Sequence, residues 1–166
     1  MLRSRVLKLI FIVWVLAALA APTSAQTSTA TLSADIRTLA KLTLSTSSVT
    51  FPDADPDVVP QVPPTGGPIT ITAKSRATAG AQVILTVVAS DDLRSGVQVI
   101  GASAITWTTT GAGFQPGTLS KTTPATLAQW TGSGTRSGTQ QLMFRNLWSY
   151  ATGTYSLSLT YTLSSP

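Results

Sequence analysis

The strict alternation of the final segment constrains the fold of this chain most. From Tyr155 to Leu163 every odd position is Tyr or Leu, and every even position is Ser or Thr. Successive side chains of a β-strand point to opposite faces, so this period of two predicts a strand with one buried and one solvated face. We expect Leu157, Leu159 and Tyr161 to be buried and the Ser and Thr side chains between them to be exposed.

Similar patterns predict several more short strands, separated by Gly, Pro, Asn and Asp. They are Ala30–Ile36, Leu39–Leu44, Val49–Phe51, Ile69–Lys74, Val83–Ala89, Val97–Ile100, Ala104–Thr109, Leu127–Trp130 and Thr139–Asn146. Val83–Ala89 is apolar almost throughout, which favours a central strand covered on both faces. Short strands with regular turns predict an all-β fold, and we expect an immunoglobulin-like antiparallel β-sandwich.

The first 25 residues have the three parts of a cleavable signal peptide. A basic start is followed by the apolar run Leu9–Ala21, by Pro22 and by the small residues Thr23-Ser24-Ala25. The apolar run is shorter than the roughly 20 residues of a membrane-spanning helix. We therefore expect cleavage after Ala25, a secreted or cell-surface protein, and one domain over residues 26–166. Within it, the Pro- and Asp-rich residues 52–68 predict an exposed loop.

Composition argues against catalysis and against nucleic-acid binding. The chain contains no His, Cys or Glu, which supply most general bases, thiolate nucleophiles and metal ligands. Ser and Lys are adjacent at Lys74-Ser75 and Ser120-Lys121, but no Ser-x-x-Lys or Gly-x-Ser-x-Gly motif occurs. Basic residues beyond the leader are scattered singly, whereas nucleic-acid surfaces need clustered positive charge. We expect a protein without enzymatic activity.

A short acidic series provides a candidate metal site. Asp53, Asp55 and Asp57 alternate with Ala and Pro, and alternating carboxylates can converge on Ca²⁺. Asp91 and Asp92 would join them if the two loops meet. The Gly and the closing Glu of an EF-hand loop are missing, so an acidic surface loop is the alternative.

The aromatic residues suggest two different roles. Trp107 and Trp130 lie within predicted strands, and we expect them in the core. Trp148 and Tyr150 lie between strands, where they could be partly exposed and contact a partner or a glycan. An aromatic strip on one solvent face would indicate a carbohydrate-binding module.

The low charge of the predicted sheets leaves few Lys residues to protect their edges from pairing with another chain. The segment Gln26–Ile36 could be a strand donated to a neighbouring molecule, with Leu32 and Ile36 as its large apolar side chains. The alternative is that it pairs within its own sheet.

The final segment, from Gly153 to Pro166, resembles the closing strand of bacterial secreted surface domains. WxL-type domains have a similar alternation of Tyr, Leu, aromatic and Leu, with Tyr161 at the position of the family's tryptophan. Spore-coat-U-like and fimbrial-subunit domains resemble Ala34–Phe51 and this last strand. The resemblance implies an immunoglobulin-like sandwich displayed or assembled at a bacterial surface. We expect a structural or adhesive protein of the cell surface, in the form of a fimbria-like self-assembling subunit, with no cofactor other than the candidate Ca²⁺. The alternatives are a carbohydrate-binding module and a calcium-stabilised accessory domain.

Overall fold

The computed structural model describes residues 28–166 of the chain. The predicted signal peptide and its cleavage site after Ala25 lie outside the described residues. The chain divides into two units, Met1–Ala34 and Asp35–Pro166. The described part of the first unit, residues 28–34, is exposed and has no secondary structure.

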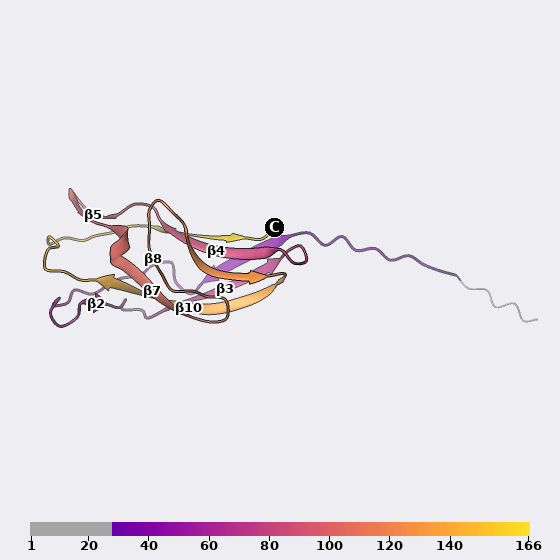
Figure 1. Ribbon diagram of the computed structural model, residues 1–166, viewed down its shortest axis with the longest axis horizontal. Coiled ribbons are helices and arrows are strands. Elements are labelled where there is room, and N and C mark those ends of the chain that lie inside the picture. Colours follow the sequence, from indigo (N-terminus) through magenta and orange to yellow (C-terminus); the bar gives the residue numbers. More distant parts are fainter. Residues whose placement is uncertain (1–27) are drawn as a thin grey trace, which may run out of the picture. The chain divides into compact units, whose positions relative to one another are not determined.

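The second unit is an antiparallel β-sandwich, which confirms the predicted fold class (Figure 1). One sheet has the strand order β1-β3-β10-β7-β8, and β2 pairs with the end of β10. Its strands are β1 Leu39–Leu44, β2 Gln61–Val62, β3 Ile69–Arg76, β7 Ile105–Thr110, β8 Gly117–Thr118 and β10 Gly134–Arg145.

The second sheet has the order β11-β4-β9, and a hairpin of β5 and β6 forms a separate pair. The bounds are β4 Gln82–Ala89, β9 Ala125–Thr131, β11 Leu159–Ser164, β5 Leu93–Ser95 and β6 Gln98–Ile100, with a 3₁₀ turn, η1, at Ala102–Ala104. The central position of β4 agrees with its apolar sequence. Its odd-numbered residues are buried and its even-numbered residues are half-buried from Ile84 to Val88.

The core lies between the two sheets and contains the tryptophans that the sequence places there. Trp107 and Trp130 are both buried, which confirms that prediction. Trp107 lies directly over the backbone of Gly117. A Cβ atom added at Gly117 would come within 2.8 Å of Trp107 Cη2, so the packing of this ring requires glycine.

Three predictions about local structure are wrong. Ala30–Ile36 and Val49–Phe51 form no strand. Residues 52–68 are not an exposed loop throughout, because β2 lies within them and Val62 and Pro64 are buried. The alternation of Ala30–Ile36 is that of a strand, but this segment pairs with no strand of the described residues.

The final strand follows the predicted alternation but not the predicted burial. Leu157, Leu159 and Tyr161 face the interior, and the residues between them are exposed. All three are only half-buried, however. Leu159 and Tyr161 lie on β11, the edge strand of a three-stranded sheet with β4 as its one neighbour in the sheet, and Leu157 lies just before this strand. The period of two determines which face is inward, and the number of neighbouring strands determines how much of that face is covered.

Candidate functional site: the open side of the sandwich

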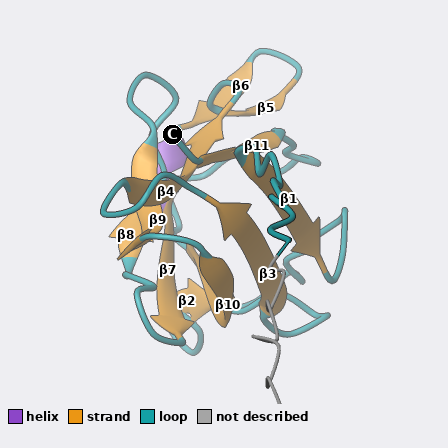
Figure 2. Ribbon diagram, turned by 90° about the vertical axis from the view of Figure 1, so that its right-hand side faces the viewer, coloured by secondary structure: helices purple, strands orange, loops and turns teal. Residues whose placement is uncertain are grey.

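The two lateral sides of the sandwich, with β7 and β9 on one and β1 and β11 on the other (Figure 2), differ in their backbone hydrogen bonding. On one side, the segment around β8 joins the sheets: Gln115 N–H donates to Leu127 O of β9 at 2.8 Å, and Leu119 N–H donates to Ile105 O of β7 at 2.9 Å. We call this the closed side. On the other side, β1 and β11 lie side by side, and within residues 28–166 no backbone hydrogen bond joins them. We call this the open side.

A row of partly covered apolar side chains lies along the open side. Its members contact the buried core and are only half-buried themselves. They are Leu42 and Leu44 on the β1 side and Leu157, Leu159, Tyr161 and Leu163 on the β11 side. In contrast, inward residues on the inner strands, such as Ile71 and Leu85, are completely buried. The apolar core therefore reaches the surface along this side.

The outer edges of β1 and β11 add unpaired backbone groups to this apolar row. Each is the terminal strand of its sheet, so its outer N–H and C=O groups have no ladder partner within the described residues. At one end of the open side, Thr78 N–H donates to Pro166 O at 3.0 Å. An edge of this kind can accept a further strand.

A polar pair lies beneath the open side. The Tyr161 hydroxyl donates to Gln140 Oε1 at 2.8 Å, and the Gln140 side chain is completely buried. Burial raises the pKa of Tyr161 to about 12 because the phenolate would lose its hydration. Gln140 Nε2 has no hydrogen-bond partner among the described residues.

The predicted partner-contact residues of the N-terminal segment are both exposed. Leu32 is 96% exposed and Ile36 is 71% exposed. Residues 28–38 have no strand pairing, and the one side-chain ion pair of this described stretch joins Arg37 Nε to Asp35 Oδ2 at 2.9 Å. The prediction that the segment pairs within its own sheet is therefore wrong for the described residues.

The three Asp residues of the predicted calcium site do not form a metal-binding group. Within residues 28–166 no group of three or more acidic side chains is placed to hold a metal ion. Asp55 Oδ1 accepts the backbone N–H of Asp57 at 2.9 Å, and Asp57 Oδ1 accepts the indole N–H of Trp148 at 3.0 Å. The two carboxylates thus order the loop and its aromatic neighbour.

The two aromatic residues between β10 and β11 have different environments. Trp148 is 70% exposed, whereas Tyr150 is half-buried and its ring centroid lies 5.8 Å from that of Phe144. The ring centroid of Phe51 also lies 5.8 Å from that of Phe144. Tyr150 therefore belongs to the packing beneath the loops, and Trp148 alone presents its ring to solvent.

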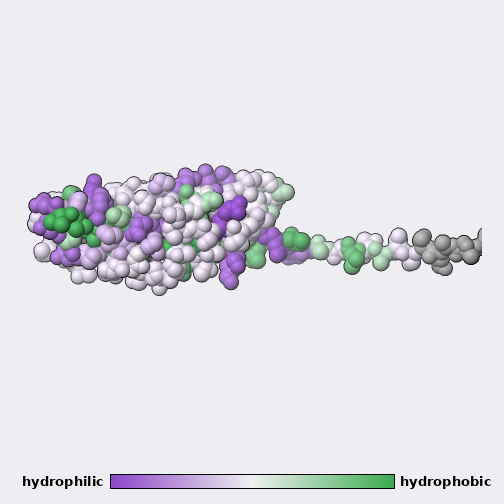
Figure 3. Space-filling view, turned by 90° about the horizontal axis from the view of Figure 1, so that it is seen from below, coloured by the Kyte–Doolittle hydropathy of each residue, from purple (hydrophilic) through white to green (hydrophobic). Residues whose placement is uncertain are grey.

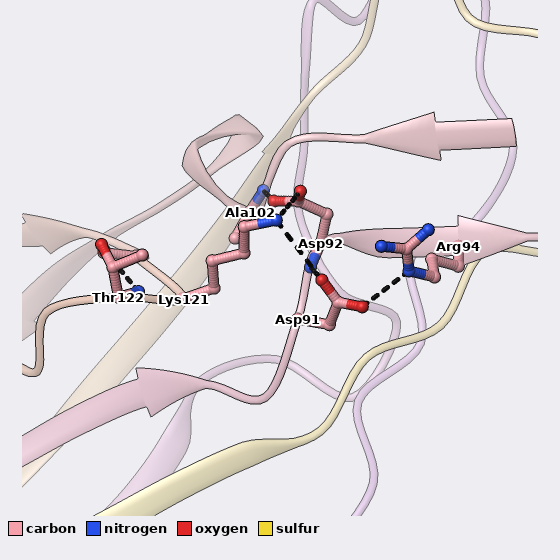
Figure 4. A network of polar contacts seen from close by, with 7 residues as sticks. Asp91, Asp92, Arg94, Ala102, Lys121 and Thr122 are labelled. Carbon is pink, nitrogen blue, oxygen red and sulfur yellow. Dashed lines mark hydrogen bonds and ion pairs between the residues drawn. The ribbon is translucent and has the colours of Figure 1, made fainter.

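Asp91 and Asp92 lie in the loop between β4 and β5 and belong to an ion network (Figure 4). Lys121 Nζ lies 2.5 Å from Asp92 Oδ2, and Arg94 Nε lies 2.6 Å from Asp91 Oδ2. The hydrogen bond from Arg94 holds the pKa of Asp91 well below its ordinary value, and the hydrogen bond from Lys121 lowers that of Asp92. Asp92 Oδ1 also accepts Ala102 N–H at 2.9 Å, so the network ties β4, η1 and the loop after β8 together.

The adjacent Ser and Lys pairs do not form a catalytic dyad in the described residues. Lys121 is engaged by Asp91 and Asp92. Ser75 Oγ is buried without a hydrogen-bond partner, and Lys74, the preceding residue of the same strand, is exposed on the opposite face.

The open side was not predicted from the sequence, because which strand edges are exposed depends on the order of the strands in the two sheets.

No helix of residues 28–166 has the length and apolar character needed to cross a membrane. Comparison of the chain with protein-family models, with curated proteins and with solved structures finds no match.

Proposed function

We propose that this protein is a secreted, non-catalytic surface protein of structural or adhesive role, which assembles by accepting a strand from a second copy at its open side. The observation that carries the proposal is the row of half-buried apolar side chains between two unpaired strand edges. An added strand would cover this row with side chains and satisfy the edge with main-chain hydrogen bonds. The resemblance of the last strand to bacterial surface domains supports the same role.

The N-terminal segment has the pattern that such an added strand requires. Ala30, Leu32, Ala34 and Ile36 share one face of an extended chain, and the residues between them are polar or charged. Residues 28–38 extended would span about 36 Å, against about 20 Å for the six residues of β11. Burying Leu32 and Ile36 would contribute on the order of 1.5–3 kcal/mol each.

The sequence before β1 favours donation to another molecule. To pair with the outer edge of its own β1, the segment would have to reverse direction in a tight turn just before Leu39. Two-residue hairpin turns need residues with positive φ, which are mostly Gly, Asn or Asp-Gly. Residues 33–38 read Ser-Ala-Asp-Ile-Arg-Thr and contain neither Gly nor Asn.

Size-exclusion chromatography over a range of concentrations, with negative-stain microscopy, tests the proposal on the exported protein. We expect wild type to form oligomers or filaments. Deletion of residues 26–36 should give a monomer with an unchanged β-sheet circular dichroism spectrum. Leu32→Asp with Ile36→Asp should also prevent assembly, whereas the matched control Thr31→Asp with Ser33→Asp, on the opposite face, should assemble.

A second measurement identifies the receiving edge. A synthetic peptide of residues 28–38 should bind the deletion variant and protect the amides of β1 or β11 from hydrogen exchange. A wild-type protein that stays monomeric at high concentration and does not bind the peptide would overturn the proposal. A deletion variant that unfolds would show instead that the segment belongs to the core of its own domain.

A further inference from the structure

The loop that presents Trp148 is held rigidly, although the ring itself is exposed. Two loops meet here, residues 52–60 and residues 146–150. The Asn146 side chain donates from Nδ2 to Ala54 O at 2.8 Å, and Asn146 N–H donates to Pro60 O at 3.0 Å. Trp148 Nε1 donates to Asp57 Oδ1 at 3.0 Å as the third bond between the loops. These bonds fix the orientation of the indole before any ligand arrives.

The loop of Asp57 is ordered from within as well. Asp55 accepts three backbone N–H groups: Asp57 N–H at its side chain, and Val58 N–H and Val59 N–H at its carbonyl. Beneath the two loops, Phe51, Phe144 and Tyr150 pack ring against ring. Trp148 is 70% exposed although its indole N–H is held by Asp57, so the ring is both oriented and open to solvent, which suits it to binding.

The chemistry around the ring restricts what could bind. The indole N–H is already used, so Trp148 presents its faces and no free donor. Val58, next to Asp57, is 75% exposed, and Leu147, next to Trp148, is half-exposed at 41%. Figure 3 shows hydrophobic residues gathered at the end of the sandwich where Figure 1 places β2. The loop 52–60 adds three carboxylates and no basic side chain.

We propose that Trp148 and Asp57 form a stacking site for a neutral pyranose residue of a polysaccharide. The C–H face of the sugar would lie on the indole, and Val58 and Leu147 would extend this apolar contact. Asp57, with Oδ1 fixed by the indole, would accept a sugar hydroxyl at Oδ2. One exposed ring with two flanking aliphatic side chains is far smaller than the roughly 800 Å² per partner of a stable protein interface. The carboxylates would repel an acidic glycan.

This site is independent of the assembly proposed above, because it lies on the loops after β10 and before β2 rather than on β1 and β11. Affinity electrophoresis of the exported protein in gels containing mixed-linkage β-glucan, xylan or mannan tests it. Chitosan, which carries ammonium groups, and alginate, which is acidic, serve as charged probes. We expect retardation by at least one neutral polysaccharide and quenching of the fluorescence of Trp148, since Trp107 and Trp130 are buried.

Four variants separate stacking from other modes of binding. Trp148→Ala should weaken binding roughly tenfold or more, and Trp148→Tyr should restore part of it. Asp57→Asn, which keeps an acceptor for the indole, should retain much of the neutral binding. Val97→Ala removes an even more exposed apolar side chain from the β5–β6 hairpin and should change nothing.

Three outcomes would overturn the proposal. They are binding of none of the neutral polysaccharides, neutral binding that survives Trp148→Ala, and binding to chitosan alone that is lost in Asp57→Asn. The last result would indicate recognition of an ammonium group by the ring and the carboxylate. The Leu32→Asp, Ile36→Asp variant should bind polysaccharide like wild type, so failure of assembly and failure of sugar binding are distinguishable.

Discussion

The closed and open sides of this sandwich border the same core, yet only one of them is sealed. On the closed side, the chain between β7 and β9 bonds to both strands, and Trp107 fills the space over Gly117. On the open side, the inward residues of β1 and β11 have no strand beyond them within the described residues and remain half-buried. The difference shows that the alternation of a strand specifies an apolar face, whereas its coverage depends on a neighbour.

A matched pair of leucines measures this difference most directly. Leu85 on β4 and Leu163 on β11 are register partners, and they face the same core. Leu85 is fully buried and Leu163 half-buried. We expect Leu85→Ala to lower the free energy of unfolding by about 2–5 kcal/mol through lost transfer energy and a cavity. Leu163→Ala should cost about 1–2 kcal/mol, because part of its surface already contacts water.

Urea denaturation of monomeric protein at low concentration gives both values. Equal losses would mean that the open side is as well covered in solution as the closed side. In assembled protein the cost of Leu163→Ala should rise towards that of Leu85→Ala, because an added strand would complete its burial.

The Tyr161 hydroxyl predicts a loss of stability in alkali that originates at the open side. Burial raises the pKa of Tyr161 from 10.0 to about 12. The stability that this shift contributes is fully present below pH 10 and is lost as the pH rises through 12, since the unfolded chain ionises first. The expected loss is at most about 2–3 kcal/mol.

Tyr161→Phe separates this effect from other alkaline titrations. The variant should be less stable at neutral pH, because Gln140 loses the hydroxyl that bonds Oε1. Its stability should then fall less steeply than that of wild type between pH 10 and 12. Parallel pH profiles for the two proteins would contradict the assignment, and phenolate absorbance would follow the titration directly.

Much of the fold is predictable from local pattern, and most of the candidate sites are not. The β-strand at Leu39–Leu44 has the bounds that the alternation predicts, and Trp107 and Trp130 are in the core as expected. Ala30–Ile36 has an equally good alternation and forms no strand, because the pattern carries no information about a pairing partner. β2 is missed because it has two residues within a Pro-rich segment.

The candidate sites depend on contacts between residues far apart in the chain. The exposure of Trp148 follows from its position between strands, so sequence reasoning finds it. Its hydrogen bond to Asp57 joins residues 91 positions apart, and the Asp series is then better explained as loop structure than as a calcium site. The open side likewise requires the strand order, which places the first and last strands of the sandwich at neighbouring edges.

The smallest expected effect concerns the ion network that joins the loop after β4 to the loop after β8. Lys121 and Arg94 lower the pKa values of Asp92 and Asp91, so the network contributes stability above the ordinary Asp pKa of about 3.9, and this stability is lost as the pH falls through the lowered values. All four side chains are partly exposed, and screening by water and salt keeps the contribution small.

Asp91→Asn with Asp92→Asn keeps an acceptor for Ala102 N–H and removes both charges. The variant should therefore unfold close to wild type at neutral pH and should lose less stability than wild type on acidification below pH about 4. Asp53→Asn, outside any ion pair of the described residues, is the matched control and should follow wild type. An acid profile of the double variant identical to that of wild type would show that hydrogen bonds and packing, and not these charges, hold the two loops together.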